Sequence, residues 1–137
     1  MKKTILLTGA TDGIGLATAK ALAAQGHDLL LHGRNPDKLA TAEAAVAAQP
    51  GAGGVVGYLA DLSSMEAVEA LAKAVADQHP ALDVVINNVD IFKAPDPITL
   101  DGLDIRFAVN TLAPYLLTKR LLPVLGPGGR VVNLSSA

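Results

Sequence analysis

The sequence predicts an α/β fold, a doubly wound parallel sheet with helices on both faces. Short apolar runs that suit strands alternate along the 137 residues with longer stretches of helical spacing. Parallel strands need long crossover connections, and helices supply them in this alternating order. Half of the residues are apolar and the mean hydropathy is +0.38, which is enough to form a buried core. The length fits one domain over residues 1–137.

Five short runs with the composition of strands are the candidates for the sheet. Right-handed crossovers between parallel strands leave few arrangements, and the strand order 3-2-1-4-5 is the simplest of them. The glycine-rich stretch before the third run is expected to be a loop. The five runs cover residues 4–8, 28–32, 55–60, 83–87 and 130–134.

Two helices are expected in the first half of the chain. The first covers residues 14–25 and is expected to end at Gly26, because glycine readily takes the left-handed conformation that closes a helix. The second begins at Asn35, whose side chain can cap a helix. The proline that follows Asn35 has its φ angle already fixed near the helical value.

Two further helices are expected in the second half. Ser63, with Glu66 three residues later, has the spacing of a capping box and predicts that the third helix begins there. The fourth helix is expected over residues 99–125. It would end at residues 126–129, Gly-Pro-Gly-Gly, because this sequence cannot continue a helix.

Composition excludes several classes of function. With 11 basic and 13 acidic residues the net charge is −2, so no basic face is available for nucleic acid or an anionic membrane. The absence of cysteine excludes disulfides, a thiol nucleophile and a Cys-ligated metal. His27, His32 and His79 lack metal-ligand spacing, so no metal site is expected. No run approaches the roughly 18 apolar residues of a membrane span, and the opening apolar run is too short for a signal peptide, which favours a cytoplasmic protein.

The strongest motif lies where the first strand passes into the first helix. A diphosphate needs backbone N–H groups at a helix N-terminus and no side chains in its way. Gly9 would allow the tight bend, Gly13 the approach of the phosphates, and Gly15 close packing of the helix. An ordinary glycine-rich turn is the alternative, but the strand–helix context favours dinucleotide binding. The residues assigned to this site are Thr8, Gly9, Thr11, Asp12, Gly13, Ile14 and Gly15.

The end of the second strand predicts which dinucleotide is bound. A site for NAD usually has an acidic side chain here that accepts a hydrogen bond from the ribose 2′-hydroxyl. This sequence has Gly33, Arg34 and Asn35 instead. A guanidinium can hold a 2′-phosphate with charge-assisted hydrogen bonds, so NADP(H) is favoured over NAD(H). Alternatively, Arg34 is simply a solvated loop residue. The missing acid also disfavours a methyltransferase-like Rossmann domain that binds S-adenosylmethionine.

Taken together, the motifs resemble the N-terminal half of a short-chain dehydrogenase/reductase, which has a Rossmann-type fold. Matches run from residue 4 to residue 136, and residues 103–125 further resemble the retinol-dehydrogenase-like branch. The motifs are Thr8-Gly9-Ala10-Thr11-Asp12-Gly13-Ile14-Gly15, Asp61-Leu62, Asn87-Asn88, Phe107-Ala108-Val109-Asn110 and Val131-Val132-Asn133-Leu134-Ser135-Ser136.

The resemblance implies further site residues. Asp61 would contact the adenine, and Leu62 would line the adenine pocket. Asn87 would support the end of the fourth strand beside the cofactor. Asn110 would be the active-site asparagine, which kinks its helix and holds a water, and Ser136 would be the serine that hydrogen-bonds the substrate carbonyl. Each residue has a simpler alternative, since Asp61 could cap a helix, Asn110 could be a paired polar residue and the serine could end a strand.

One motif departs from the family pattern. Where the family usually has Asn-Asn-Ala-Gly, this chain has Asn-Asn-Val-Asp, from Asn87 to Asp90. Asn88 and Val89 are still expected beside the cofactor. The branched Val89 and the charged Asp90 are expected to weaken binding at the nicotinamide end, and Asp90 takes positive φ less readily than glycine.

The resemblance implies hydride transfer between nicotinamide and a carbonyl or alcohol substrate. The family's catalytic tyrosine and lysine follow its serine, and the residues after Ser136 do not include them. The chain is therefore expected to stop before strands six and seven, and to bind cofactor with little or no turnover. The alternative is a non-catalytic module, truncated, split or engineered, that needs a partner chain.

A second Tyr-x-x-x-Lys spacing is present but falls in the wrong place. Tyr115 and Lys119 precede Ser136 and lie on the helix of Asn110. Tyr115 is expected to pack in the core or an interface, with Lys119 at the surface. The uncovered sheet edge and the fourth helix are expected to mediate homo-oligomerisation or pairing with another chain.

Overall fold

The computed structural model describes residues 1–92 and 94–134 and contains a five-stranded sheet. All neighbouring strands are parallel, and their order is β3-β2-β1-β4-β5, as the sequence predicts. The first four strands begin and end within one residue of the expected positions. The strands are β1 (Thr4–Leu7), β2 (Asp28–Gly33), β3 (Val55–Leu59), β4 (Leu82–Asn87) and β5 (Leu125–Asn133).

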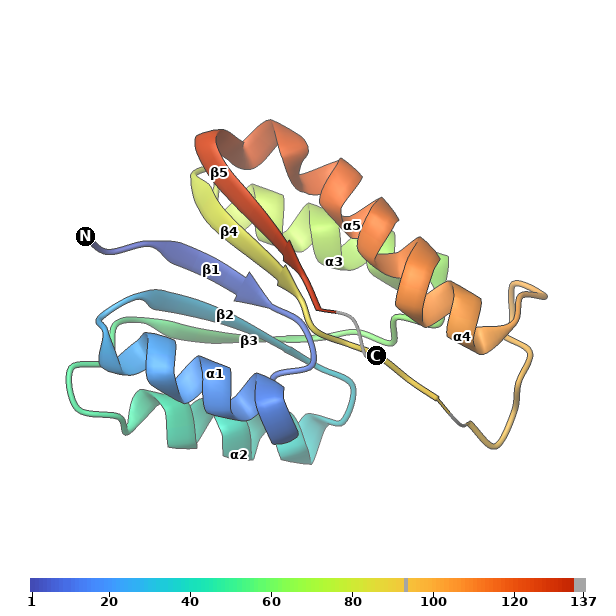
Figure 1. Cartoon of the computed structure of the whole chain (residues 1–137), viewed down its shortest axis with the longest axis horizontal. Coiled ribbons are helices and arrows are strands. Elements are labelled where there is room, and N and C mark those ends of the chain that lie inside the picture. The colour runs from blue at the N-terminus through green and yellow to red at the C-terminus, as the bar shows by residue number, and fades with distance from the viewer. Residues whose placement is uncertain (93, 135–137) are drawn as a thin grey trace.

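Helices cover both faces of the sheet (Figure 1). α1 (Gly13–Ala24) and α2 (Pro36–Ala47) lie on one face, and α3 (Met65–Gln78) and α5 (Ala113–Leu121) lie on the other. Successive side chains of a strand point to opposite faces. Leu7 therefore packs in the core beneath α1 and α2, whereas Leu6 packs in the core beneath α3 and α5. This two-sided burial explains why the strands are continuously apolar.

The caps of the first two helices agree with the sequence, but the start of α3 does not. Gly26 follows α1 with φ +90°, and the Asn35 side chain accepts hydrogen bonds from two amides of α2. The predicted capping box at Ser63 is wrong, because Ser64 caps α3 by accepting from the Ala67 amide at 3.2 Å. Ser63 instead donates both its amide and its hydroxyl to Asp61 Oδ1, at 2.9 and 2.7 Å.

The fourth helix begins later than predicted. Residue 99 opens a turn rather than a helix, because the Thr99 hydroxyl accepts the Leu103 amide at 3.2 Å. Asp104 then caps a short helix by accepting the Arg106 amide. The helical segments are α4 (Ile105–Phe107), the π-helical η1 (Ala108–Leu112), α5, and the 3₁₀ turn η2 (Leu122–Val124).

The last strand begins five residues before the predicted residue 130. Leu125 pairs with Leu82 and Arg130 pairs with Val84, so residues 126–129 form an irregularity inside β5 and not a turn before it. An edge strand tolerates glycine and proline because one side of it has no hydrogen-bonding partner strand. Among the helices in the described ranges, none has the length and apolar character that a bilayer crossing requires.

Candidate functional site

The turn between β1 and α1 depends on glycine at three positions. Gly9 and Gly13 have φ of +66° and +54°, in the left-handed region that favours glycine. A Cβ at Gly15 would overlap the carbonyl oxygen of Gly9, so the helix packs directly against the turn. A Cβ at Gly13 would meet no atom within 4 Å. The turn is therefore tight on its inner side and open on its outer side.

The open side presents backbone amides. Leu16 makes the first helical hydrogen bond of α1, to the Asp12 carbonyl, and Asp12 provides no side-chain cap. Among the hydrogen bonds of residues 1–92 and 94–134, none uses the amides of Asp12, Gly13 or Ile14. By contrast, α2, α3 and α4 each have a side chain that accepts from their first amides. The N-terminus of α1 can thus bind an anion through its amides and the helix dipole.

Hydrogen bonds fix this turn to the strand beside it. The buried Thr8 hydroxyl donates to the Ile86 carbonyl and accepts the Asn88 amide, at 3.4 and 3.0 Å. The Asn88 side chain donates to the Gly9 carbonyl at 3.1 Å. Val89 packs against the apolar cluster beneath α3 and α5, and its Cγ2 would lie 2.9 Å from a Cβ at Gly9. The segments that follow β1 and β4 therefore hold each other in place.

The residues expected to contact the adenosine part lie at the ends of β2 and β3. Arg34 is exposed and has no hydrogen bond or ion pair within the described part of the chain. A Cβ at Gly33 would lie 2.6 Å from the Thr11 methyl group, so the strand end is packed tightly against the turn. Asp61 is exposed and bonded to Ser63, whereas Leu62 is mostly buried.

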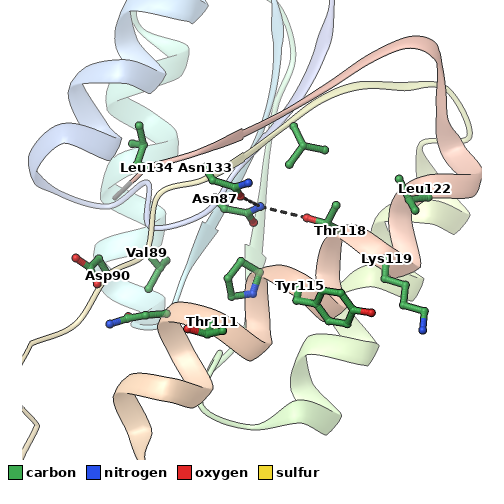
Figure 2. Close-up of a pocket in the computed structure, with 13 residues that line it drawn as sticks. Asn87, Val89, Asp90, Thr111, Tyr115, Thr118, Lys119, Leu122, Asn133 and Leu134 are labelled. Atoms are coloured by element: carbon green, nitrogen blue, oxygen red, sulfur yellow. Dashed lines mark hydrogen bonds between the residues drawn. The ribbon is translucent and has the colours of Figure 1, made fainter. Parts of the chain in front are cut away.

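A cavity of about 820 Å³ lies between α5 and the ends of β4 and β5 (Figure 2). At its floor the Asn87 amide group donates to Thr118 and Asn133, at 3.2 and 2.9 Å. Asn87 is 6% exposed, and its Oδ1 has no hydrogen-bond partner in the part of the chain that the structure describes. The lining residues are Asn87, Val89, Asp90, Asn110, Thr111, Pro114, Tyr115, Thr118, Lys119, Leu122, Val131, Asn133 and Leu134.

Asn110 lies in the π-helical turn η1, which interrupts the α-helical pattern between α4 and α5. Its side chain accepts the Ile91 amide and donates to the Ile91 carbonyl, both at 2.8 Å. π-helical turns often occur at functional sites. Here the turn brings an amide side chain against the segment after β4, so Asn110 holds in place the chain that includes Val89 and Asp90. No described residue other than glycine has positive φ, so Asp90 takes its place without backbone strain.

Tyr115 is not a core residue, which corrects one of the two alternatives given for it. Its side chain is 64% exposed and lies at the edge of the cavity with Lys119 (Figure 2). Lys119 Nζ lies 5.9 Å from the centre of the Tyr115 ring, within cation–π distance. Ser136, the proposed catalytic serine, lies outside the described residues.

His32 is a site-related residue that the sequence reasoning passed over. Only 3% of it is exposed, and both ring nitrogens are hydrogen-bonded, Nδ1 to the Gly9 amide and Nε2 to the Ala60 carbonyl. Burial lowers the pKa of His32, while the bond to Ala60 and the charge of Asp61 act in the opposite direction. A polar residue inside an apolar strand, two positions before Arg34, is the signal that could have identified it.

Comparison with known proteins identifies the family of the chain. The sequence profile of the short chain dehydrogenase family matches residues 3–137. The chain belongs to the short-chain dehydrogenase/reductase family. It is 48% identical over 117 residues to the uncharacterized oxidoreductase AN7799 of Emericella nidulans, which covers 83% of this chain. It is 33% identical over 136 residues to human retinol dehydrogenase 13, over 98% of this chain.

A solved structure has the same fold. A metagenomic short-chain oxidoreductase in complex with NADP superimposes with a TM-score of 0.81 at 30% identity, over 98% of this chain. The chain spans 44% of the length of AN7799, 41% of retinol dehydrogenase 13 and 62% of the metagenomic enzyme. The chain therefore shares its fold, as well as its sequence pattern, with this enzyme.

Proposed function

We propose that this chain binds NADP(H) as the cofactor-binding part of an oxidoreductase that transfers hydride between nicotinamide and a carbonyl or alcohol. The nicotinamide would supply or accept the hydride, and the protein would bind and orient the two reactants. The metagenomic relative is in complex with NADP, which supports a nicotinamide cofactor for this fold.

The open N-terminus of α1 is the observation on which this proposal depends most. The amides of Gly13 and Ile14 have no internal acceptor among the described residues, and the space beside Gly13 is empty to 4 Å. A diphosphate would satisfy these amides and interact favourably with the helix dipole. The residues present therefore fit the cofactor at its diphosphate.

Arg34 supports NADP(H) rather than NAD(H). Its exposed guanidinium has no carboxylate partner in residues 1–92 and 94–134, so it is available to a phosphate. Gly33 before it adds no side chain, and Asn35 after it caps α2. A guanidinium pairs with a phosphate through two parallel hydrogen bonds, which a hydroxyl group cannot match.

The remaining site residues have proposed roles along the ends of the strands. Asp61 and Leu62 would flank the adenine. Asn87, Asn88 and Val89 would shape the nicotinamide end, where the bonds of Asn88 to Thr8 and Gly9 already fix the backbone. Asn110 and Ser136 would be the catalytic residues, and the Asn110 bonds to Ile91 would keep this end of the site rigid.

A calorimetric titration with NADPH and NADH tests the proposal. The unmodified protein is expected to bind NADPH at least about tenfold more tightly, which is about 1.4 kcal/mol. Arg34→Ala should remove this preference and leave NADH binding nearly unchanged. Arg130→Ala is the matched control, because Arg130 is also exposed but lies on β5. An unchanged preference in Arg34→Ala would contradict the role of Arg34, and no binding of either nucleotide would contradict the proposal itself.

Turnover separates an enzyme from a module that only binds. In the Tyr115–Lys119 pair, Lys119 lies over the tyrosine ring, and we expect neither residue to act as the acid. The 137 residues alone should therefore bind NADPH but oxidise it slowly or not at all with a panel of aldehydes and ketones. Rapid oxidation of NADPH would exclude the interpretation of this chain as a non-catalytic module.

We also propose that a second copy of the chain covers the face formed by α5 and β5. Exposed apolar side chains gather there, and Tyr115, Leu122 and Leu134 line the same cavity. β5 is in addition an edge strand. Such surfaces favour association.

A further inference from the structure

His32 connects three segments that meet at the carboxyl ends of the central strands. It is the penultimate residue of β2, and its backbone carbonyl accepts the Ala10 amide at 2.9 Å. Its ring bonds to the Gly9 amide at 3.1 Å and to the Ala60 carbonyl at 2.8 Å. The turn after β1 and the segment after β3 are thus both attached to one side chain of β2.

The two ring contacts determine the form of the imidazole. A backbone amide can only donate, so Nδ1 must accept and has no proton. A backbone carbonyl can only accept, so Nε2 must hold the proton. His32 is therefore neutral, with its proton on Nε2, and protonation of Nδ1 would place two donors opposite each other at Gly9.

The bond to Gly9 differs from the open amides further along the turn. Gly9 N–H is directed to a buried ring, whereas the amides of Gly13 and Ile14 have no partner among the described residues. Without an acceptor at position 32, the part-buried Gly9 amide would lose this hydrogen bond, and the turn would be held less firmly. A turn held at Gly9 keeps the amides that follow it in a fixed orientation.

We propose that His32 is a positioning residue, which holds the glycine turn in the geometry that binds the dinucleotide by accepting the Gly9 amide. It acts through Gly9, because its buried ring is not exposed to a ligand. This inference rests on the proposed function. It assigns the affinity for the diphosphate partly to a residue outside the glycine motif.

Two substitutions at position 32 separate the two ring contacts. Asn places its amide oxygen near the position of Nδ1, so His32→Asn can still accept the Gly9 amide. Gln places its polar atoms one bond further along, near Nε2, so His32→Gln can reach Ala60 but leaves Gly9 unpaired. His27→Asn is the matched control, because His27 Nδ1 also accepts a backbone amide, that of Lys3, but at the opposite end of the sheet.

Binding is measured by calorimetry with ADP-ribose, which contains the diphosphate but lacks the 2′-phosphate. The 2′-phosphate itself titrates at about pH 6. His32→Asn and His27→Asn should bind within about twofold of the unmodified protein, and His32→Gln about tenfold more weakly. Equal affinities of the Asn and Gln variants would overturn the inference. If the unmodified protein binds no ADP-ribose, the proposed function fails as well.

A measurement on the unmodified protein does not depend on whether the variants fold. In ¹⁵N-labelled protein, nuclear magnetic resonance should detect scalar coupling between the Gly9 nitrogen and His32 Nδ1 across the hydrogen bond. On acidification, the Gly9 amide signal should shift together with the His32 ring signals. Absence of the coupling, or a Gly9 signal that ignores the His32 titration, would overturn the inference without affecting the proposed function.

Discussion

Gly15 is the residue at which a side chain is least tolerated. Its Cβ would overlap the Gly9 carbonyl, and backbone cannot move as readily as a flexible side chain. We expect Gly15→Ala to lower the free energy of unfolding by about 3 kcal/mol, as for strong overpacking, and to abolish NADPH binding. Gly126→Ala is the control, because its Cβ would meet nothing within 4 Å, and it should change stability by at most about 0.5 kcal/mol. Urea unfolding measures both values, and equal losses would contradict the close packing at Gly15.

His32 predicts how stability depends on pH. Burial lowers its pKa below the usual 6.5, so the unfolded chain binds a proton that the folded chain does not. The contribution of His32 to the free energy of unfolding should therefore be constant above pH 6.5. It should fall as the pH drops from 6.5 towards the pKa that His32 has in the folded protein. Asp28 and Asp104 also have lowered pKa values, but the stability that these carboxyls contribute is lost only below their usual pKa of 3.8.

A comparison with a variant that lacks the imidazole isolates the contribution of His32 to this pH dependence. Urea unfolding of the unmodified protein and of His32→Asn should be compared between pH 7.5 and 5, because Asn does not titrate. The difference in stability between the two proteins should change with pH in this range. A constant difference would mean that His32 titrates alike in the folded and unfolded chains.

At the scale of residues, the sequence predicts local geometry better than distant partners. The turn from Gly9 to Gly15 has the expected conformations, because they depend on the backbone at those positions. His32 was missed because its partners are 23 and 28 residues away. The pairing of Asn110 with Ile91 spans 19 residues and could not be predicted from either residue alone.

At the scale of elements, the start of α3 gives a direct test. Ser63 and Ser64 are adjacent, and only Ser64 accepts an amide of the helix. Ser64→Ala should lower the free energy of unfolding by about 1 kcal/mol, the usual loss for an N-cap. Ser63→Ala should cost less, since it removes only an exposed bond to Asp61. Thermal or urea unfolding decides between the two serines, and a larger loss at Ser63 would restore the capping box first predicted.

Other element boundaries were wrong for a related reason. Ser63, Thr99 and Asp104 all have side chains that can end or begin a helix, and sequence spacing does not say which one does. Thr99 uses its hydroxyl in a turn and Asp104 caps the helix. Residues 126–129 contain the signal of a turn, but pairing of Leu125 with Leu82 extends the strand across them. Tertiary pairing overrides local preference at such sites.

At the scale of the whole molecule, the order of the strands was predictable because connection rules leave few choices. Right-handed crossovers that place helices on both faces of the sheet put β1 in its interior, as observed, with two helical layers (Figure 1). The two apolar clusters lie beneath these two layers. The cavity beside α5 was not predictable, because its walls combine side chains from β4, β5 and α5.

The face formed by α5 and β5 leads to a prediction about assembly. Leu122 on this face and Leu59 on the opposite edge strand β3 are both 56% exposed, so they form a matched pair. If a second copy covers α5 and β5, Leu122→Lys buries a charge and removes apolar contact, twice in a symmetric dimer. The dissociation constant of the Leu122→Lys dimer should be about tenfold higher or more, whereas Leu59→Lys should leave association unchanged.

Sedimentation velocity over a range of protein concentrations distinguishes these outcomes. Both variants change the net charge by +1, so a general effect of charge on association would appear in both. Selective loss of the dimer in Leu122→Lys would locate the contact at the cavity edge, since Leu122 lines it. A dimer that dissociates only in Leu59→Lys would place the interface at β3. A protein that stays monomeric at all concentrations would exclude the second copy.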